Sequence, residues 1–337
     1  MVEMFLYIIQ CLLFLNYNKS FLKIMKKKYL IVLLGFISTL VACNNKSSNK
    51  ENDTLNSGSI KIAVDETFKP IIEEELQVFL AMNPEATIIP IFCDEVEAIN
   101  LLMKDSVRFV VSSRTLTPSE TDYFNKKKFY PQAIRIATDG LALIVNKENK
   151  DSLISTWQFK QILAGKITKW NQLGYSSCEK DINVVFDNPN SSTIHYVIDS
   201  ICKGVPFSNN IKAMSNNKEV IEYVAKNVDA MGVVGANWVI NSADSTNLSF
   251  INDVRIMSVS EEKIAETTNS YKPYQAYLAL DRYPLLRNVY IILNDPKSGL
   301  PSGFSSFITG FRGQRIILKS GLLPTMAELR IVNVNEE

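Results

Sequence analysis

The chain has 337 residues with 36 basic and 35 acidic side chains, so its formal net charge is only +1. It contains no basic stripe with interleaved aromatic residues, which argues against a nucleic-acid-binding protein. The single histidine, His195, and the scattered cysteines leave no spacing of metal ligands, so we expect neither a metal ion nor a cofactor.

The first recognisable element is an export signal that begins at Met25. Three lysines precede an apolar run that ends in Leu40-Val41-Ala42-Cys43. A basic start, an apolar centre and a small residue before the cleavage point are typical of a secretory signal, and the run is too short to favour a membrane span. The ending resembles the bacterial lipobox, in which the cysteine is acylated. We therefore expect a signal peptide at residues 25–42 and a lipid anchor at Cys43.

The residues on either side of this signal have different predicted roles. Residues 1–24 do not fit a signal, which suggests an extension from a misassigned start codon; a second, short membrane segment is the weaker alternative. Residues 43–58 are rich in Asn, Ser and Lys and predict a flexible tether. Together these features place a globular body in a bacterial cell envelope, exported and held to a membrane by its lipid.

After the tether, strands alternate with helices. Apolar runs predict strands at residues 59–65, 86–92 and 107–113, with helices at 67–84 and 94–106 between them. Thr117 to Glu120 form a capping box with Pro118 at the first helical position, so a further helix begins there. This alternation predicts an α/β fold with mostly parallel sheets.

Two long strands are expected to cross between two lobes, near residues 138–146 and 275–285. The second lies in a predicted strand over residues 274–294. Lobe 1 would then comprise residues 59–138 and 280–337, and lobe 2 residues 139–279. Further helices and strands are predicted in lobe 2, and two helices before Gly321 close the chain. The predicted fold is two mostly parallel sheets, each flanked by helices, joined by two hinge crossings.

Ligands of such sheets bind beyond the carboxyl ends of the strands. Four strand–helix junctions are polar here, and they lie at residues 65–68, 93–94, 112–115 and 190–193. The first three belong to lobe 1 and the fourth to lobe 2, a layout that suits a cleft closing on a small anion. At the fourth junction, Asn190, Ser191, Ser192 and Thr193 precede a helix, where such side chains either cap the helix or hold an oxyanion.

The order of motifs resembles the phosphate-binding periplasmic proteins of ABC transporters, in the type II periplasmic binding-protein family, over about residues 58–325. The most specific piece is "FKQILAGKITKWNQL" at residues 159–173, which is similar to a Phe-x-Gly-Lys-Ile-x-x-Trp run of that family. "VRFVVSSRTLTPSE", "INVVFDNPNSST" and "DAMGVVGANWV" follow the same order. The resemblance implies a monomeric, two-lobed receptor that captures an inorganic oxyanion, in the first place phosphate, and passes it to an ABC permease.

The resemblance also implies a set of ligand residues. Thr67 and Phe68 would offer a hydroxyl and backbone N–H groups from lobe 1. The other positions carried over are Asp94, Ser112 and Ser113 in lobe 1 and Asn190, Ser191, Ser192 and Thr193 in lobe 2. Glycines that the family prefers at the last loop are replaced here, at Asn190 and Ser192.

The charges differ from the family pattern. The family's acid falls at about Ser113, beside Arg114, and its arginine falls at about Asp187, as if the charges were exchanged between the lobes. Arg114 would then supply the bidentate contact to the oxyanion, while Asp187 accepts the phosphate proton or pairs with Arg114. A plain ion pair across the lobes, or surface charges that never meet, are the alternatives. Asp139 at the hinge is a further candidate contact.

Two other functions stay open at this stage. One is an envelope sensor or interaction protein in which anion binding is altered or lost. The other, less favoured, is an exported hydrolase that uses Ser191 or Ser192 with His195; no Gly-x-Ser-x-Gly motif supports it, and we expect no enzyme. His195 is otherwise expected to be structural, and Cys178 and Cys202 either form a disulfide or stay free.

Overall fold

The computed structural model describes residues 53–174, 179–241, 243–244 and 249–326. These residues belong to one unit that begins at Asp53. The predicted signal peptide, Cys43 with most of the tether, and Cys178 lie outside the described residues, so the lipid anchor and the disulfide stay predictions. Across the described ranges, none of the helices combines the length and the apolar character needed to span a membrane.

The described chain starts with a βαβαβ arrangement and continues through a long strand into a second α/β region. The elements before the long strand are β1 (Gly58–Asp65), the 3-10 turn η1 (Glu66–Phe68), α2 (Lys69–Met82), β2 (Ala86–Cys93), α3 (Glu95–Met103), β3 (Phe109–Ser112) and α4 (Pro118–Lys126). The next elements are β4 (Gln132–Val145), β5 (Leu153–Ser155), α5 (Thr156–Leu163), η2 (Trp170–Leu173), β6 (Asn183–Phe186), α6 (Ser192–Tyr196) and the π-helical turn η3 (Val197–Cys202).

The remaining elements complete the second region and return to the first. They are β7 (Ile211–Ala213), α7 (Asn217–Lys226), β8 (Ala230–Gly235), η4 (Ala236–Trp238), β9 (Arg255–Ile256), β10 (Ser258–Ser260), α8 (Gln275–Ala279), β11 (Leu286–Leu293), α9 (Leu300–Thr309), α10 (Phe311–Lys319) and β12 (Leu323–Pro324).

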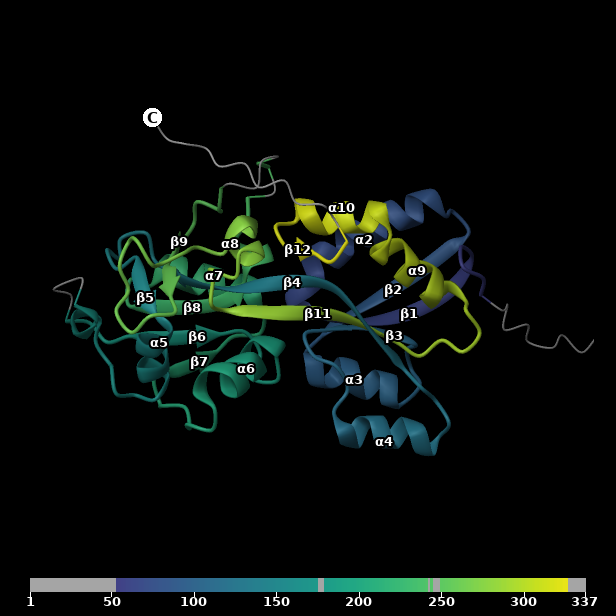
Figure 1. The fold of residues 1–337 in the computed structure, drawn as a ribbon, viewed down its shortest axis with the longest axis horizontal. Coiled ribbons are helices and arrows are strands. Elements are labelled where there is room, and N and C mark those ends of the chain that lie inside the picture. The colour runs from purple at the N-terminus through teal and green to yellow at the C-terminus, as the bar shows by residue number, and fades with distance from the viewer. Residues whose placement is uncertain (1–52, 175–178, 242, 245–248, 327–337) are drawn as a thin grey trace, which may run out of the picture. The chain divides into compact units, whose positions relative to one another are not determined.

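One continuous sheet carries both lobes, with the strand order β2-β1-β3-β11-β4-β8-β6-β7. The strands at the two ends pair in parallel, β1 with β2 and β3, and β6 with β7 and β8. Strands β4 and β11 pair with each other antiparallel in the middle and link the two ends (Figure 1). We call the part built on β1, β2 and β3 lobe 1 and the part built on β6, β7 and β8 lobe 2. The predicted α/β fold with a mostly parallel sheet in each lobe and two crossings is confirmed; the predicted lobe boundaries stay a prediction.

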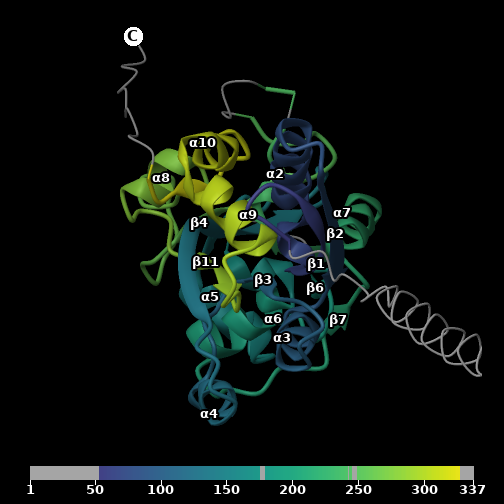
Figure 2. The ribbon, with the colours of Figure 1, turned by 90° about the vertical axis from the view of Figure 1, so that its right-hand side faces the viewer.

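Lobe 1 is a three-layer sandwich because its strands are apolar on both faces. Alternate residues of β1 separate into two cores: Ile62 and Val64 pack with α2 and α9, while Ala63 packs with α3. Helices α2, α9 and α10 cover one face of the sheet and α3 and α4 the other (Figure 2). The predicted capping box of α4 is present, with Thr117 and Glu120 bonded reciprocally.

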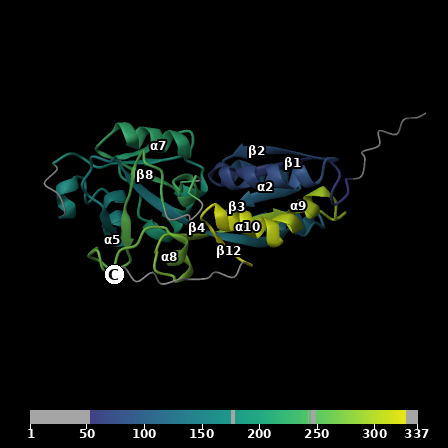
Figure 3. The same ribbon diagram turned by 90° about the horizontal axis from the view of Figure 1, so that it is seen from above.

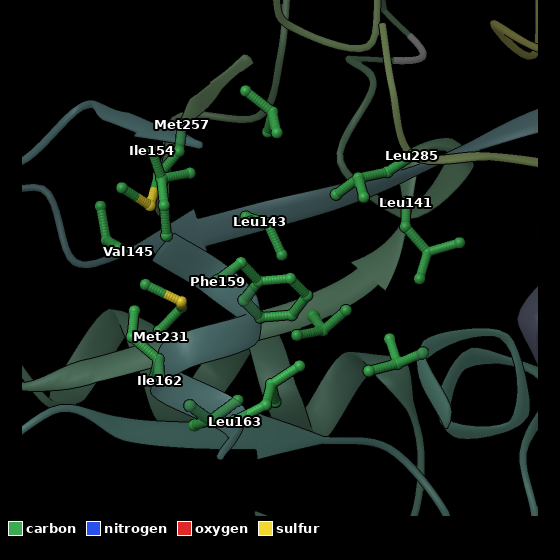
Figure 4. Packing of buried hydrophobic residues seen from close by; sticks show 14 of the residues in the cluster. Leu141, Leu143, Val145, Ile154, Phe159, Ile162, Leu163, Met231, Met257 and Leu285 are labelled. Atoms are coloured by element: carbon green, nitrogen blue, oxygen red, sulfur yellow. The ribbon is translucent and has the colours of Figure 1, made fainter. Parts of the chain in front are cut away.

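Lobe 2 has the same three-layer arrangement, with helices on both faces of its sheet. Along β4, Leu141, Leu143 and Val145 face the core that contains Phe159 of α5, as Figure 4 shows. The residues between them, Ala142 and Ile144, face α7. Helices α5 and α7 therefore lie on opposite faces of this half of the sheet (Figure 3).

The second crossing differs from the prediction. A single strand was expected over residues 274–294, but α8 occupies Gln275–Ala279 and β11 begins only at Leu286. Asp281 has φ +51°, in the left-handed region, and ends the helix. Pro284, which has no backbone N–H, precedes the strand. The crossing therefore lies in β11, later than expected, and this shift brings Arg287 to the hinge.

Candidate functional site

An ion pair between the two crossing strands lies at the centre of the candidate site. Arg287 of β11 and Asp139 of β4 are directly opposite in the antiparallel register. Arg287 donates to Asp139 Oδ2 from Nε at 3.0 Å and from Nη2 at 2.8 Å, and both side chains are buried. Burial raises the pKa of Asp139, and the Arg287 charge opposes that rise. The pair places one positive charge inside the hinge.

The remaining amino group of Arg287 faces hydroxyls of lobe 2. Nη1 donates to Ser192 Oγ at 3.0 Å and to Thr193 Oγ1 at 3.4 Å. Thr67 of lobe 1 completes the group, since its Oγ1 lies 3.4 Å from Ser192 Oγ. The guanidinium carbon lies 5.1 Å from the centre of the Phe68 ring. We call Arg287, Asp139, Thr67, Ser192 and Thr193 the Arg287 site; it combines a cation with three hydroxyls from both lobes.

The lobes are in contact around this site. The carbonyl of Thr67 accepts hydrogen bonds from Asn237 Nδ2 at 2.9 Å and from Trp238 Nε1 at 2.8 Å, both in lobe 2. Gly235 makes the approach possible, because a Cβ there would lie 2.5 Å from Asn237 Oδ1 and 2.9 Å from Thr67 Cγ2. The two lobes therefore contact each other directly at the Arg287 site.

Two buried carboxylates adjoin the Arg287 site, one from each lobe. Asp65 accepts from the backbone N–H of Thr67 at 3.1 Å through Oδ1, while its Oδ2 accepts no hydrogen bond. Burial and the nearby charge of Glu95 raise the pKa of Asp65 to about 7. Asp187 accepts hydrogen bonds from Ser191 and Thr193, yet burial raises its pKa to about 6.

A second polar cluster joins the lobes near α3. The buried Glu95 Oε1 accepts from Ser112 Oγ at 2.8 Å and from Ser113 N and Oγ at 2.9 Å. Its Oε2 lies 3.3 Å from Nδ1 of His195 in lobe 2 and 3.6 Å from Nε of Arg114. We call these residues the Glu95 cluster. Burial opposes ionisation, but the bonds from His195 and the two serines lower the pKa of Glu95 to about 2.

The residues of the predicted polar loop of lobe 2, at positions 190–193, have different roles in the structure. Ser191 caps α6 by accepting from Ile194 N at 3.3 Å, while Ser192 and Thr193 face Arg287. Asn190 is exposed, and its backbone N–H donates to Asn188. Capping and a polar site are thus both present, on neighbouring residues.

Most of the ligand residues predicted in lobe 1 do not lie in the Arg287 site. Asp94 caps α3 by accepting from Glu97 N at 2.9 Å, and Ser112 and Ser113 are bonded to Glu95. The alternative pair of Arg114 with Asp187 is wrong, because Arg114 is bonded in its own lobe to both carboxylate oxygens of Glu120 at 2.8 and 2.9 Å. An arginine so paired has little capacity left for a ligand. The acid that lies beside Ser113 in the structure is Glu95 of α3, which accepts hydrogen bonds from the backbone N–H and the hydroxyl of Ser113.

Sequence reasoning missed Arg287 and Glu95, and it placed Asp65 in a polar junction without assigning a role to it. A signal for the first was available, since Arg287 and Asp139 each interrupt an apolar strand with a charge. Charges of opposite sign inside two buried strands have to be paired, which indicates that those strands are neighbours. Asp65 and Glu95 carry no comparable signal, because acids at helix starts are common caps.

Comparisons with known proteins agree with this architecture. Among curated proteins, the chain is 25% identical over 306 residues to the phosphate-binding protein PstS of Borreliella burgdorferi, covering 88% of this chain and 98% of that protein. It is 27% identical over 242 residues to a PstS of Staphylococcus aureus, covering 71% and 72% of the two chains.

Solved structures show the same fold. A substrate-binding protein with bound phosphate from Clostridium perfringens matches with a TM-score of 0.65 and 23% identity, over 80% of this chain and all (100%) of that one. An ABC-type phosphate transport receptor from Vibrio cholerae matches with a TM-score of 0.59 and 21% identity, over 79% and 100%. The family description "PBP superfamily domain" matches residues 49–311. The chain therefore belongs to the PBP superfamily, the periplasmic binding proteins.

Proposed function

We propose that this protein is a receptor that captures phosphate between its lobes and delivers it to an ABC importer. We further propose that it is exported, anchored through a lipid on Cys43, and active as a monomer at the cell envelope. The names of its curated relatives and the lipobox-like sequence support these proposals. The relatives are binding proteins of transport rather than enzymes, which favours capture over catalysis.

One observation carries the phosphate proposal: a buried arginine whose Nη1 faces hydroxyls while its other donors are held by Asp139. A guanidinium is the side chain best suited to a phosphate oxygen, and hydroxyls can turn their protons toward an anion. Asp139 fixes the orientation of Arg287 and leaves that one edge for a ligand. Asp65, with Oδ2 unbonded, would accept the proton that hydrogen phosphate carries and sulfate lacks.

A second candidate function is an envelope interaction protein that binds no anion. The direct bonds between Arg287 and the hydroxyls, and the 3.4 Å contact of Thr67 with Ser192, favour it, because the cluster is satisfied without a ligand. The hydrolase has less support. His195 Nδ1 faces Glu95, and the Ser191 hydroxyl donates to Asp187, so neither side chain is arranged for a nucleophile and its base.

The test is thermal unfolding of the protein after denaturation and refolding to remove bound anions, with phosphate or sulfate added. A native-state ligand stabilises by about 2.7 kcal/mol at a hundredfold excess over Kd. We expect a response to phosphate that is lost in Thr193→Val and Ser192→Ala. Arg114→Gln is the matched control and should keep the response. No response to phosphate in the unmodified protein would favour the interaction protein.

A further inference from the structure

A cavity opens beside the Arg287 site, and its lining is strongly acidic. It has a volume of about 270 Å³ and lies between the two lobes. Five carboxylates line it, those of Asp65, Glu66, Asp94, Glu97 and Asp187, and its lining includes no Lys, Arg or His. None of the five belongs to an ion pair within the part of the chain that the structure describes.

This cavity adjoins the Arg287 site, and two residues of its lining, Asp65 and Asp187, accept hydrogen bonds from residues of that site. Asp187 accepts from Thr193, whose hydroxyl also accepts from Arg287. Asp65 is only 1% exposed, lines the cavity, and bonds to Thr67 of the Arg287 site, while its Oδ2 has no partner. A buried carboxylate oxygen without a donor is costly, so Oδ2 is an acceptor that a donor group of a ligand can satisfy.

The charge balance restricts what can bind here. A phosphate dianion at Arg287 would face five acidic side chains, of which Asp65 and Asp187 have pKa values raised to about 7 and about 6, and the one buried cation there is already paired with Asp139. Lys69 lies near the cavity wall, 5.2 Å from the Phe92 ring centre; its charge opposes the rise that burial causes in the pKa of Glu66, and it also pairs with Glu73 at 3.9 Å. Like charges this close disfavour one another, so a ligand that brings its own positive charge fits better than a bare anion.

The arrangement of the acids favours an ammonium group over a metal ion. Within the described ranges, no three His, Cys, Asp or Glu side chains are grouped closely enough to hold a metal ion. The carboxylates are instead spread around the cavity wall. An alkylammonium offers three donors in different directions and suits dispersed acceptors.

We propose that the preferred ligand is a zwitterion, a phosphoryl or phosphonyl group with a short ammonium arm, as in phosphoethanolamine or 2-aminoethylphosphonate. This inference rests on the proposed function, because the phosphorus oxyanion occupies the Arg287 site. The ammonium arm enters the acidic cavity, where it donates to Asp65 and Asp187 and is attracted by Asp94 and Glu97. Capture is non-covalent and the ligand leaves unchanged.

The test is isothermal titration of the refolded, anion-free protein with four probes: inorganic phosphate, ethylphosphonate, 2-aminoethylphosphonate and phosphoethanolamine. Ethylphosphonate matches the carbon arm of 2-aminoethylphosphonate but lacks the amine. We expect the amine to tighten binding by about tenfold or more, the factor that one well-placed ion pair supplies. Tighter binding of phosphoethanolamine than of 2-aminoethylphosphonate would identify an ester as the natural class, and the reverse a phosphonate.

Variants keep the test specific. Asp94→Asn combined with Glu97→Gln keeps the cap of α3, since Asn also caps helices. It should reduce the preference for the amine severalfold while leaving phosphate binding intact or tighter. Asp122→Asn, in α4 and remote from the cavity, is the matched control. Equal binding of ethylphosphonate and 2-aminoethylphosphonate, or binding of phosphate alone, would overturn the inference and leave the proposed function standing. If none of the four probes bound, both this inference and the proposed function would be wrong.

Discussion

The Arg287 site and the Glu95 cluster both join the two lobes through buried charge, but they differ in how their hydrogen bonds are used. Oxygens of Glu95 receive donors from Ser112, Ser113 and His195, so the cluster is complete within the protein. In the Arg287 site, Asp139 holds two of the guanidinium nitrogens and the third contacts only hydroxyls, which can rotate. The Glu95 cluster, whose hydrogen bonds are all made within the protein, therefore joins the lobes. In the Arg287 site the hydroxyls can rotate, so a contact within the protein can be replaced by a contact to a ligand.

The same comparison separates two buried carboxylates of lobe 1. Glu95 and Asp65 are both inaccessible to solvent, at 0% and 1% exposure. Burial acts against the charge of both, yet the pKa of Glu95 is lowered to about 2 and that of Asp65 is raised to about 7. Glu95 has several donors, whereas the pKa of Asp65 is lowered by Ser192, Arg287 and one backbone N–H and is raised by the charge of Glu95. Donors and neighbouring charges, and not burial alone, therefore separate the pKa values of the two acids.

The largest expected effect tests the pairing in the Arg287 site. Arg287→Met leaves Asp139 buried without its cation, and we expect a loss of about 3–5 kcal/mol in the free energy of unfolding. Urea denaturation measures it. Combining Arg287→Met with Asp139→Leu removes both charges and should restore most of the stability, while the response to phosphate stays absent. If the double variant were as unstable as the single one, the pair would not be the source of the loss.

A further buried acid, Glu75 of α2, has no hydrogen-bond partner among the described residues, and it shows what hydrogen-bond donors contribute in the two clusters. It is 0% exposed, neither carboxylate oxygen accepts a hydrogen bond, and burial with the Glu74 charge raises its pKa to about 8. The folded state therefore retains a proton that the unfolded state has lost between the ordinary pKa of 4.5 and pH 8. Stability should fall across this window, by up to about 1.4 kcal/mol per pH unit from this group.

Glu75→Met removes the titrating group at nearly constant volume. We expect this variant to exceed the wild-type stability by a few kcal/mol at pH 8 and to approach it below pH 4.5. The measurement is chemical denaturation at several pH values, with Glu85→Gln on the surface as the control. A difference that does not change with pH would mean that Glu75 does not titrate in this range.

The smallest expected effect concerns the contact of His195 with Glu95. The hydrogen bond to Glu95 raises the pKa of His195, burial and Arg114 oppose the rise, and Asp199 assists it. For a histidine with a raised pKa, the stabilisation is complete below its ordinary pKa of 6.5 and is lost as the pH rises through the folded value. The imidazole is 32% exposed, so we expect about 1 kcal/mol or less.

His195→Gln keeps a donor but cannot titrate. The difference in unfolding free energy between wild type and this variant, followed from pH 5.5 to 8.5, should favour the wild type at low pH and shrink as the pH rises. Glu95→Gln should abolish that pH dependence as well. A pH-independent difference would show that His195 contributes packing rather than charge.

The sequence by itself determined the individual helices and strands of this protein and their order along the chain. The strands β1, β2 and β3 and the cap of α4 were predicted, because each depends on a short run of neighbouring residues. Helix α2 was also predicted, although it begins at Lys69 rather than at residue 67. The polar loop at residues 190–193 was also found, since its helix start and its hydroxyls are adjacent in the chain.

Only the tertiary structure decided which charges meet. Arg287 and Asp139 are 148 residues apart, and they pair because β4 and β11 adopt one antiparallel register. Arg114, predicted to reach the other lobe, found Glu120 six residues away. A charge in a buried strand shows that a partner must exist, but its identity depends on strand pairing across the whole chain, and no local pattern encodes that pairing.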